Sequence, residues 1–283
     1  GVWVPKEYTG TYGDEGFYLQ FKETGTSANA SGKGADTSGN GNHFDDNNMD
    51  AYDITTDTPN NNFATFNPLH QNNSVGIGDV TRGSLSEGNT HFDNGGAVGG
   101  SERYYRVYST IAIPSSGKWY WEVKPTKGTS GLGFRWVMGL SELHAKWANS
   151  SFVEWTDGSY SLKGDGHIWY NNNDHADYTD LAVDNIISFK YDADNRDLYF
   201  AINGTYENSG NAVLTSTQIT TTTEKLIILQ VGSEGDVETS VNFGNAPFSI
   251  SSGNSDGNGY GNFEYAVPSG YYALCTKNLG EHG

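Results

Sequence analysis

Apolar and polar residues alternate most regularly over residues 183–204. The first half of this stretch places three apolar side chains on one face, namely Ile187, Phe189 and Tyr191. A polar turn over residues 192–196 leads into a second alternating run over residues 197–202. Asn203 and Gly204 follow, and because both readily adopt positive φ they reverse the chain again. The pattern predicts a β-hairpin with a tight turn at each end.

The same period of two predicts strands along most of the chain after residue 100. They cover residues 107–113, 117–123, 134–140, 159–162, 168–170, 237–244 and 271–276. Aromatic residues such as Trp119 and Trp121 often fill the apolar positions, as they do between the sheets of a sandwich. Residues 225–231 are mostly apolar, which predicts a strand buried on both faces. Few segments show a helical period, so we predict an all-β fold, a two-sheet antiparallel β-sandwich.

Residues 26–100 are poor in apolar residues and rich in Asn, Gly, Asp and Ser. Because a structureless loop of this length is unusual inside a compact domain, we expect the segment to lie over the sandwich. The apolar anchors expected to hold it there are Phe44, Phe63, Phe66 and Leu69.

No linker divides the chain, so we predict a single β-sandwich domain over residues 1–283. Its core covers about residues 100–250. An N-terminal strand and covering loops occupy residues 1–99, and residues 251–283 hold a closing strand. We expect the first strand, near residues 17–21, to pair with the last, near residues 271–276.

Charge narrows the range of partners. The 34 acidic residues exceed the 16 basic ones, which gives a net charge of −18. Such a surface repels nucleic-acid phosphates and anionic lipids, so we predict no nucleic-acid partner and no membrane insertion. No apolar run reaches the length of a membrane span. The single Cys275 allows no internal disulfide, which favours a bacterial or viral origin over a secreted eukaryotic one.

Four segments, in this order, resemble a SPRY domain. They are residues 117–123, residues 159–166, the hairpin over residues 184–204, and residues 226–248 with their Asn-Phe-Gly and Pro-Phe motifs. Their order and spacing carry the resemblance. It implies a bent antiparallel sandwich related to the concanavalin-like jelly rolls, with long Gly/Asn-rich loops. It also implies a binding module, because SPRY domains share no catalytic residues.

The flanks carry a second resemblance. The matching segments are residues 8–13, 16–19, 38–42, 57–59, 67–68, 268–270 and 273–276. They are similar to SPRY-containing virion proteins of bacteriophages, especially tail-fibre-like proteins of marine phages. This implies a structural or host-attachment role in an extracellular virion, with other virion subunits as partners. It also implies a homo-oligomer, which would be a trimer in a fibre.

Glu234, Asp236 and Glu238 would share one face of a strand. This spacing resembles the catalytic strand of concanavalin-fold β-glucan hydrolases, where one carboxylate attacks the sugar and another protonates the leaving oxygen. The alternative is a solvated acidic turn. Gly235 favours the turn, because it stands where a strand-forming apolar residue is expected.

No pattern predicts a metal or a cofactor. The acidic turn over residues 192–197 could suggest calcium, but Arg196 occupies a ligand position, so a plain hairpin turn is favoured. The histidines show no zinc spacing, and the lone cysteine adds no ligand pair. We therefore predict neither a cofactor nor a metal site.

The best candidate for a binding site is the segment over residues 144–178. Sugars are bound by aromatic faces, with amides and carboxylates reading the hydroxyl groups. The candidate ligand-binding residues are Trp147, Trp155, Tyr170, Asn171, Asn172, Asp174, His175 and Tyr178. Tyr160 and Trp169 align with scaffold positions of the family, so we expect these two in the core.

These observations favour a non-enzymatic virion protein, a tail fibre or capsid-surface appendage. It would act in host attachment by recognising a glycan or protein receptor on the host cell surface. A secreted bacterial carbohydrate-binding or adhesion module is the first alternative, and a concanavalin-fold glycan hydrolase is the second.

Overall fold

The computed structural model describes residues 6–49, 51–73, 83–96, 104–128, 133–143, 157–232 and 235–283. Contacts within the chain divide it into two compact units, residues 1–54 and residues 55–283. Each unit is described by itself. The single domain expected over residues 1–283 stays a prediction.

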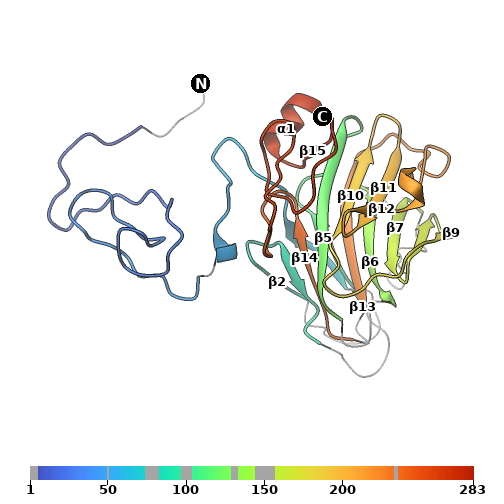
Figure 1. Cartoon of the computed structure of the whole chain (residues 1–283), viewed down its shortest axis with the longest axis horizontal. Helices are drawn as coiled ribbons and strands as arrows, with labels where there is room; N and C mark the ends of the chain where they lie inside the picture. Colours follow the sequence, from blue (N-terminus) through green and yellow to red (C-terminus); the bar gives the residue numbers. More distant parts are fainter. Residues whose placement is uncertain are drawn as a thin grey trace. The chain divides into compact units, whose positions relative to one another are not determined.

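Residues 55–283 form a sandwich of two sheets (Figure 1). In spatial order, the first sheet holds β1 (Phe66–Asn73), β4 (Tyr104–Ser109), β13 (Lys225–Gly232), β6 (Gly133–Glu142), β7 (Ser159–Gly164), β8 (His167–Tyr170) and β9 (Asn173–Asp177). The second holds β12 (Thr205–Tyr206), β11 (Asp197–Ile202), β10 (Ile187–Asp192), β5 (Lys118–Gly128), β14 (Val237–Asn242), β3 (His91–Asp93) and β2 (Ser84–Ser86). These neighbours pair antiparallel, and β15 (Tyr272–Ala273) adds one parallel pairing to β5.

The described chain contains little helix. Its helical segments are η1 (Ala51–Asp53), η3 (Asn208–Gly210) and α1 (Thr276–His282). None of the helices in the described ranges is long and apolar enough to cross a membrane. The prediction of an all-β, two-sheet antiparallel sandwich is confirmed.

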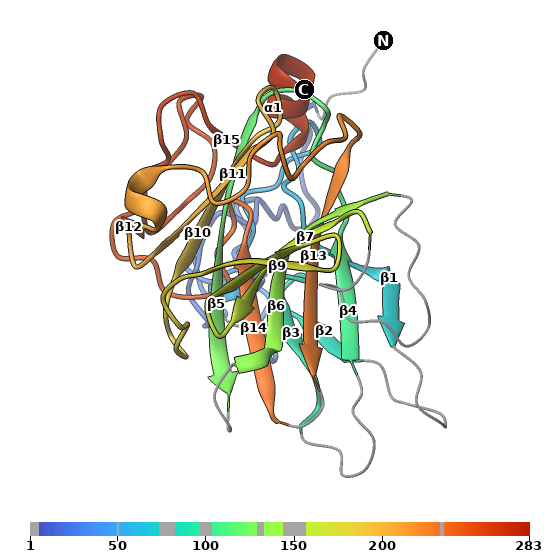
Figure 2. The same ribbon diagram turned by 90° about the vertical axis from the view of Figure 1, so that its right-hand side faces the viewer.

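Large aromatic side chains fill the space between the two sheets. Trp119 and Trp121 of β5 share one fully buried cluster with Trp136 of β6. Trp121 stacks on Phe189 of β10, with 5.2 Å between ring centroids. Strand β13 is buried along its whole length, as its apolar sequence predicts. Figure 2 shows β10, β5 and β14 running side by side in the second sheet.

The predicted hairpin over residues 183–204 is confirmed. Its strands pair from Ile187 with Ile202 to Asp192 with Asp197. Asn203 and Gly204 then have φ values of 48° and 82° and connect β11 to β12 in a tight turn.

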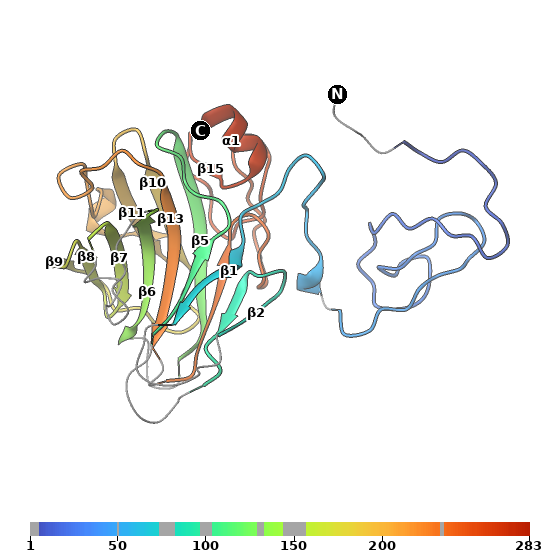
Figure 3. The ribbon, with the colours of Figure 1, turned by 180° about the vertical axis from the view of Figure 1, so that it is seen from behind.

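The C-terminal segment covers the outer face of the second sheet. Phe263, Tyr271 and Ala273 pack there with Phe63 and the β5 residue Tyr120 in a separate buried cluster. Seen from behind in Figure 3, β15 and α1 lie beside one end of β5. The segment therefore gives the second sheet a second buried face.

Beneath this segment lies the fully buried side chain of Glu122. Its carboxylate accepts hydrogen bonds from the N–H groups of Glu264 and Tyr265, at 3.0 and 2.8 Å. The Tyr120 hydroxyl and the Asn242 amide also donate to it, at 2.9 and 3.2 Å. Burial nevertheless raises the pKa of the Glu122 carboxyl group, because it disfavours the charged form.

The expected pairing of the first and last strands is wrong. Leu19 forms an isolated bridge with Asp36, whereas β15 pairs with β5. Residues 17–21 form no strand, because their backbone joins the polar network of residues 6–54 described below.

The expected apolar anchors divide into three groups. Phe63 and Phe66 are buried in the sandwich, as predicted. Leu69 is 92% exposed, so its assignment as an anchor is wrong. Leu69 follows Pro68 at a register shift between β1 and β4, where the regular alternation of the strand is lost. Phe44 belongs to the other unit, where its ring packs edge-to-face on Phe17 at 4.8 Å.

Residues 6–54 fold around the Asp36 carboxylate. The N–H groups of Tyr18, Ser38 and Asn42 donate to it at 2.8, 2.8 and 2.9 Å, and the Ser38 hydroxyl donates at 2.8 Å. Burial raises the pKa of this carboxyl group, but these hydrogen bonds outweigh burial and hold the pKa well below the ordinary aspartate value.

Other polar side chains complete this unit. Lys33 forms a buried ion pair with Asp46 at 2.8 Å. The Asn40 amide donates to the Gly13 carbonyl at 2.7 Å, and the Asn42 amide donates to the Asp14 carbonyl at 2.8 Å. These contacts bring the segments around residues 8–19 and 38–42 together.

Candidate binding site

The predicted ligand-binding residues that the structure describes lie on or next to the β8–β9 hairpin, at one end of the first sheet. Asn171 and Asn172 form its two-residue turn, with φ values of 45° and 64°. Asn tolerates the positive φ that such a turn requires. The Asn171 Oδ1 atom accepts a hydrogen bond from the Gly158 N–H at 2.7 Å, which fixes the turn. Strand β9 is an edge strand with one strand neighbour in the described part of the chain.

The β8–β9 hairpin carries rings, an amide and a carboxylate. The Tyr170 and His175 rings meet edge-to-face, with 5.5 Å between centroids. Asn172, Asp174 and His175 are exposed, and Tyr170 is half-buried. These are the groups that can stack on an apolar ligand face and hydrogen-bond its polar atoms.

Asp174 is paired with a residue that the sequence did not single out. Its carboxylate lies 3.0 Å from the Nδ1 atom of His167, and the Asp177 carboxylate lies 3.8 Å from Nε2. The hydrogen bond to Asp174 outweighs burial and raises the pKa of the His167 imidazole. The edge of the hairpin therefore carries less net negative charge when His167 is protonated.

The remaining candidates do not join this surface. Tyr178 is half-buried and packs edge-to-face on Phe200 at 5.7 Å, against the core. Trp147 and Trp155 lie outside the described residues. The full ligand-binding set stays a prediction.

Tyr160 and Trp169 were expected in the scaffold. Tyr160 is fully buried in the main core, as expected. Trp169 is half-buried on β8, where the Lys163 ammonium lies 5.5 Å from its ring centroid.

The acidic residues around position 236 are held by a lysine. Lys127 Nζ lies 2.6 Å from the Asp236 carboxylate and 2.9 Å from that of Glu238. These hydrogen bonds outweigh the effect of burial and raise the pKa of Lys127. Asp93 completes a group of three carboxylates, and Glu234 lies outside the described residues. In this arrangement Asp236 and Glu238 form ion pairs with Lys127 at the start of β14.

The acidic turn over residues 192–197 is a hairpin turn. Asp192 pairs with Lys118 at 2.8 Å and accepts a hydrogen bond from the Asn195 N–H at 3.0 Å. Its carboxylate is thus engaged in holding the turn.

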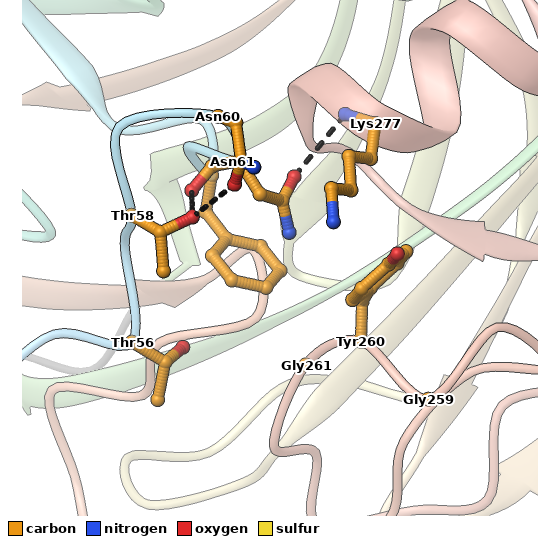
Figure 4. Close-up of a pocket in the computed structure, with 9 residues that line it drawn as sticks. Thr56, Thr58, Asn60, Asn61, Gly259, Tyr260, Gly261 and Lys277 are labelled. Carbon is orange, nitrogen blue, oxygen red and sulfur yellow. Dashed lines mark hydrogen bonds between the residues drawn. The ribbon is translucent and has the colours of Figure 1, made fainter. Parts of the chain in front are cut away.

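The structure also contains a pocket that was not predicted from the sequence. It has a volume of about 290 Å³ and lies between residues 56–63 and residues 259–277 (Figure 4). Its walls are about 200 residues apart in sequence, so no local pattern connects them.

Part of the sandwich matches a known protein family. Residues 118–245 match the family model of the SPRY domain. The SPRY domain of human HERC1 is 13% identical to this chain, with a TM-score of 0.44. The aligned region covers 62% of this chain and 96% of the HERC1 chain. A further human SPRY domain is also 13% identical, with a TM-score of 0.41, and covers 57% of this chain and 94% of its own. No curated protein matches the chain.

The prediction of a SPRY domain is therefore confirmed for residues 118–245. A SPRY domain indicates a protein-interaction module. The match ends before the C-terminal segment and begins after residues 1–117, so it leaves both flanks unassigned.

Proposed function

We propose that this protein is a non-enzymatic component of a bacteriophage virion, a tail fibre or capsid-surface appendage, that acts in host attachment. In this role the SPRY domain binds a glycan or protein receptor on the host cell surface, and other surfaces contact neighbouring virion subunits. The protein is then located on the virion, outside the host cell.

The observation that carries this proposal is the exposed surface of the β8–β9 hairpin. Tyr170 and His175 form a ring pair there, next to the exposed Asn172 and Asp174. The tight turn and the sheet behind it hold these groups in place, so little conformational entropy is lost on binding. Rigid aromatic and amide groups of this kind suit both glycans and proteins.

The N-terminal unit supports the assignment to a virion. Its segments around residues 8–19 and 38–42, which carry the resemblance to phage proteins, are joined by the Asn40 and Asn42 hydrogen bonds. The motifs before residue 55 thus belong to one folded unit. A compact unit distinct from the binding domain is suited to anchoring in a larger assembly, as a homo-oligomer that is a trimer in a fibre.

The test is binding to intact host bacteria, with a panel of bacterial strains as probes. We expect the Tyr170→Ala, His175→Ala double variant to lose about tenfold or more in affinity for the strain that binds the unaltered protein. The control is Tyr8→Ala, which removes an exposed ring from the other unit. Binding that survives the double variant unchanged contradicts the role of the hairpin.

The alternative is a secreted bacterial carbohydrate-binding or adhesion module, which the same rings, amide and carboxylate also suit. Light scattering distinguishes the two, because a fibre protein is expected as a trimer and a lectin module as a monomer. A reducing-sugar assay on soluble β-glucans tests the hydrolase, and we expect no product.

A further inference from the structure

The pocket between residues 56–63 and residues 259–277 lies outside the SPRY match. Figure 4 shows Asn61, Lys277 and Tyr260 arranged around it, with Thr56 and Thr58 along one wall. With a volume of about 290 Å³ it is at the lower end of the size range of small-molecule sites. It can therefore hold a ligand of about one sugar unit.

One wall of the pocket is fixed by hydrogen bonds between distant segments. The Asn62 N–H donates to Thr276 Oγ1, and the Thr276 N–H donates back to the Asn62 carbonyl, both at 2.9 Å. The Lys277 N–H donates to Asn61 Oδ1 at 3.1 Å. This wall is formed before any ligand arrives, which lowers the entropic cost of binding.

The opposite wall is fixed by the buried carboxylate of Asp256. It accepts hydrogen bonds from the N–H groups of Tyr260 and Ala273, each at 2.9 Å, and from the Asn278 amide at 2.7 Å. The Asp256 N–H in turn donates to the Tyr260 carbonyl at 2.9 Å. Tyr260 is therefore held at the pocket by its own backbone.

The nitrogen groups left for a ligand are donors. The Thr58 and Thr56 hydroxyls already donate to Asn60 Oδ1 and Asn245 Oδ1, at 2.9 and 2.7 Å, and Asn61 Oδ1 is engaged by the Lys277 N–H. The Asn60 amide N–H₂ group has no protein partner among the described residues, and its side chain is exposed. A donor-rich pocket selects a ligand with acceptor oxygen atoms.

The Lys277 ammonium adds a positive charge. Its Nζ lies 5.5 Å from the centroid of the Tyr260 ring, and none of the carboxylates in the described ranges lies within ion-pair distance of it. On a chain with a net charge of −18, such a cation beside amide donors is suited to bind an anion.

We propose that this pocket binds a carboxylate-bearing sugar unit, such as a uronic acid. The Lys277 ammonium pairs with the carboxylate, and the Asn60 amide donates to the carboxylate or to a hydroxyl oxygen. The half-buried Tyr260 ring lies against a C–H face of the sugar, and the Thr56 and Thr58 hydroxyls line the remaining wall. This site uses neither the β8–β9 hairpin nor the assignment to a virion.

Titration calorimetry of the full chain with glucuronate and galacturonate tests the proposal, with the neutral methyl glucoside and galactoside as matched ligands. We expect a uronate to bind and Lys277→Gln to weaken it about tenfold or more, because a charge-assisted hydrogen bond is lost. Asn60→Ala is expected to weaken it by a smaller factor. Both side chains are exposed, so both variants are expected to fold.

The control is Lys22→Gln, which removes an exposed lysine from the other unit and is expected to leave binding unchanged. Three results overturn the proposal: no heat with either uronate at up to about 10 mM, equal binding of the neutral glycosides, or uronate binding that both pocket variants leave intact. Tyr170→Ala, His175→Ala should keep uronate binding, which separates this site from the hairpin.

Discussion

Each unit of this protein buries a carboxylate that receives several hydrogen bonds, yet the two titrate in opposite directions. In residues 6–54, Asp36 accepts hydrogen bonds from three N–H groups and a hydroxyl, and its pKa is lowered. In the sandwich, Glu122 also accepts several hydrogen bonds, but it lies in a fully buried layer and its pKa is raised. The balance between hydrogen bonding and desolvation differs, because Glu122 is fully buried next to Tyr120, a member of an apolar cluster.

The difference shows what holds each unit together. The sandwich encloses large apolar clusters, and its buried carboxylate is a cost that the C-terminal segment offsets with hydrogen bonds. Residues 6–54 lack a comparable apolar cluster among those described, and their polar contacts take its place. Low pH should therefore affect the two units differently, and so should substitutions in the apolar core.

The largest effect is expected from the core of the sandwich. Trp121→Ala removes a fully buried indole stacked on Phe189 and should lower the free energy of unfolding by about 3–5 kcal/mol. Guanidinium unfolding followed by circular dichroism measures it. The matched control is Phe21→Ala, whose ring is 71% exposed, with an expected change within about 0.5 kcal/mol. Equal losses in both variants would contradict an apolar core confined to the sandwich.

A second prediction concerns Glu122. Because its folded pKa is raised, its contribution to stability is fully present below the ordinary glutamate value of 4.5 and is lost as the pH rises through the folded pKa. Glu122→Gln should flatten this part of the pH profile and cost about 1–3 kcal/mol, since an amide cannot accept from all the donors around it. Thermal melts of both proteins from acid to neutral pH measure the effect, and parallel profiles would refute it.

A more local effect is expected at Asp36. Its folded pKa is lowered, so its contribution is present above the ordinary value of 3.8 and is lost as the pH falls below it. The N–H signals of Tyr18, Ser38 and Asn42 should lose their protection in this acid range while core signals of the sandwich keep theirs. Two-dimensional NMR follows both sets of signals. Asp36→Asn should reduce the protection of the same three N–H groups already at neutral pH.

The smallest effect is expected from the Lys118–Asp192 pair at the hairpin turn. Lys118 is 37% exposed, so solvent screens the pair, and Lys118→Gln should cost about 0.2–1 kcal/mol. The loss should shrink further in high salt, which urea unfolding at two salt concentrations measures. A salt-independent loss would point to packing of the lysine stem instead.

Local patterns of the sequence were enough to predict much of the sandwich. Alternation assigned the faces of β5 and β10 correctly, and the apolar run over residues 225–231 identified a strand buried on both faces. The expectation that apolar residues in the segment over residues 26–100 act as anchors failed for Leu69, which lies at a register shift between β1 and β4. The expected partner of residues 271–276 was also wrong, because pairing depends on which strand the fold leaves available.

The candidate sites divide in the same way. The turn residues Asn171 and Asn172 could be found from composition, because both were part of a polar and aromatic segment. The ion pair of His167 with Asp174 could not, because strand β9 was not among the predicted strands. The pocket formed by Asn60, Tyr260 and Lys277 could not, because its walls meet only in the folded chain.

The sequence by itself determined the all-β class, the hairpin over residues 183–204 and the SPRY resemblance, because each depends on residue spacing within one segment. Only the tertiary structure decided that the C-terminal segment covers β5 and buries Glu122, and that residues 6–54 gather around Asp36. Burial and hydrogen bonding between distant segments depend on the folded arrangement, and those contacts set the pKa of each carboxylate.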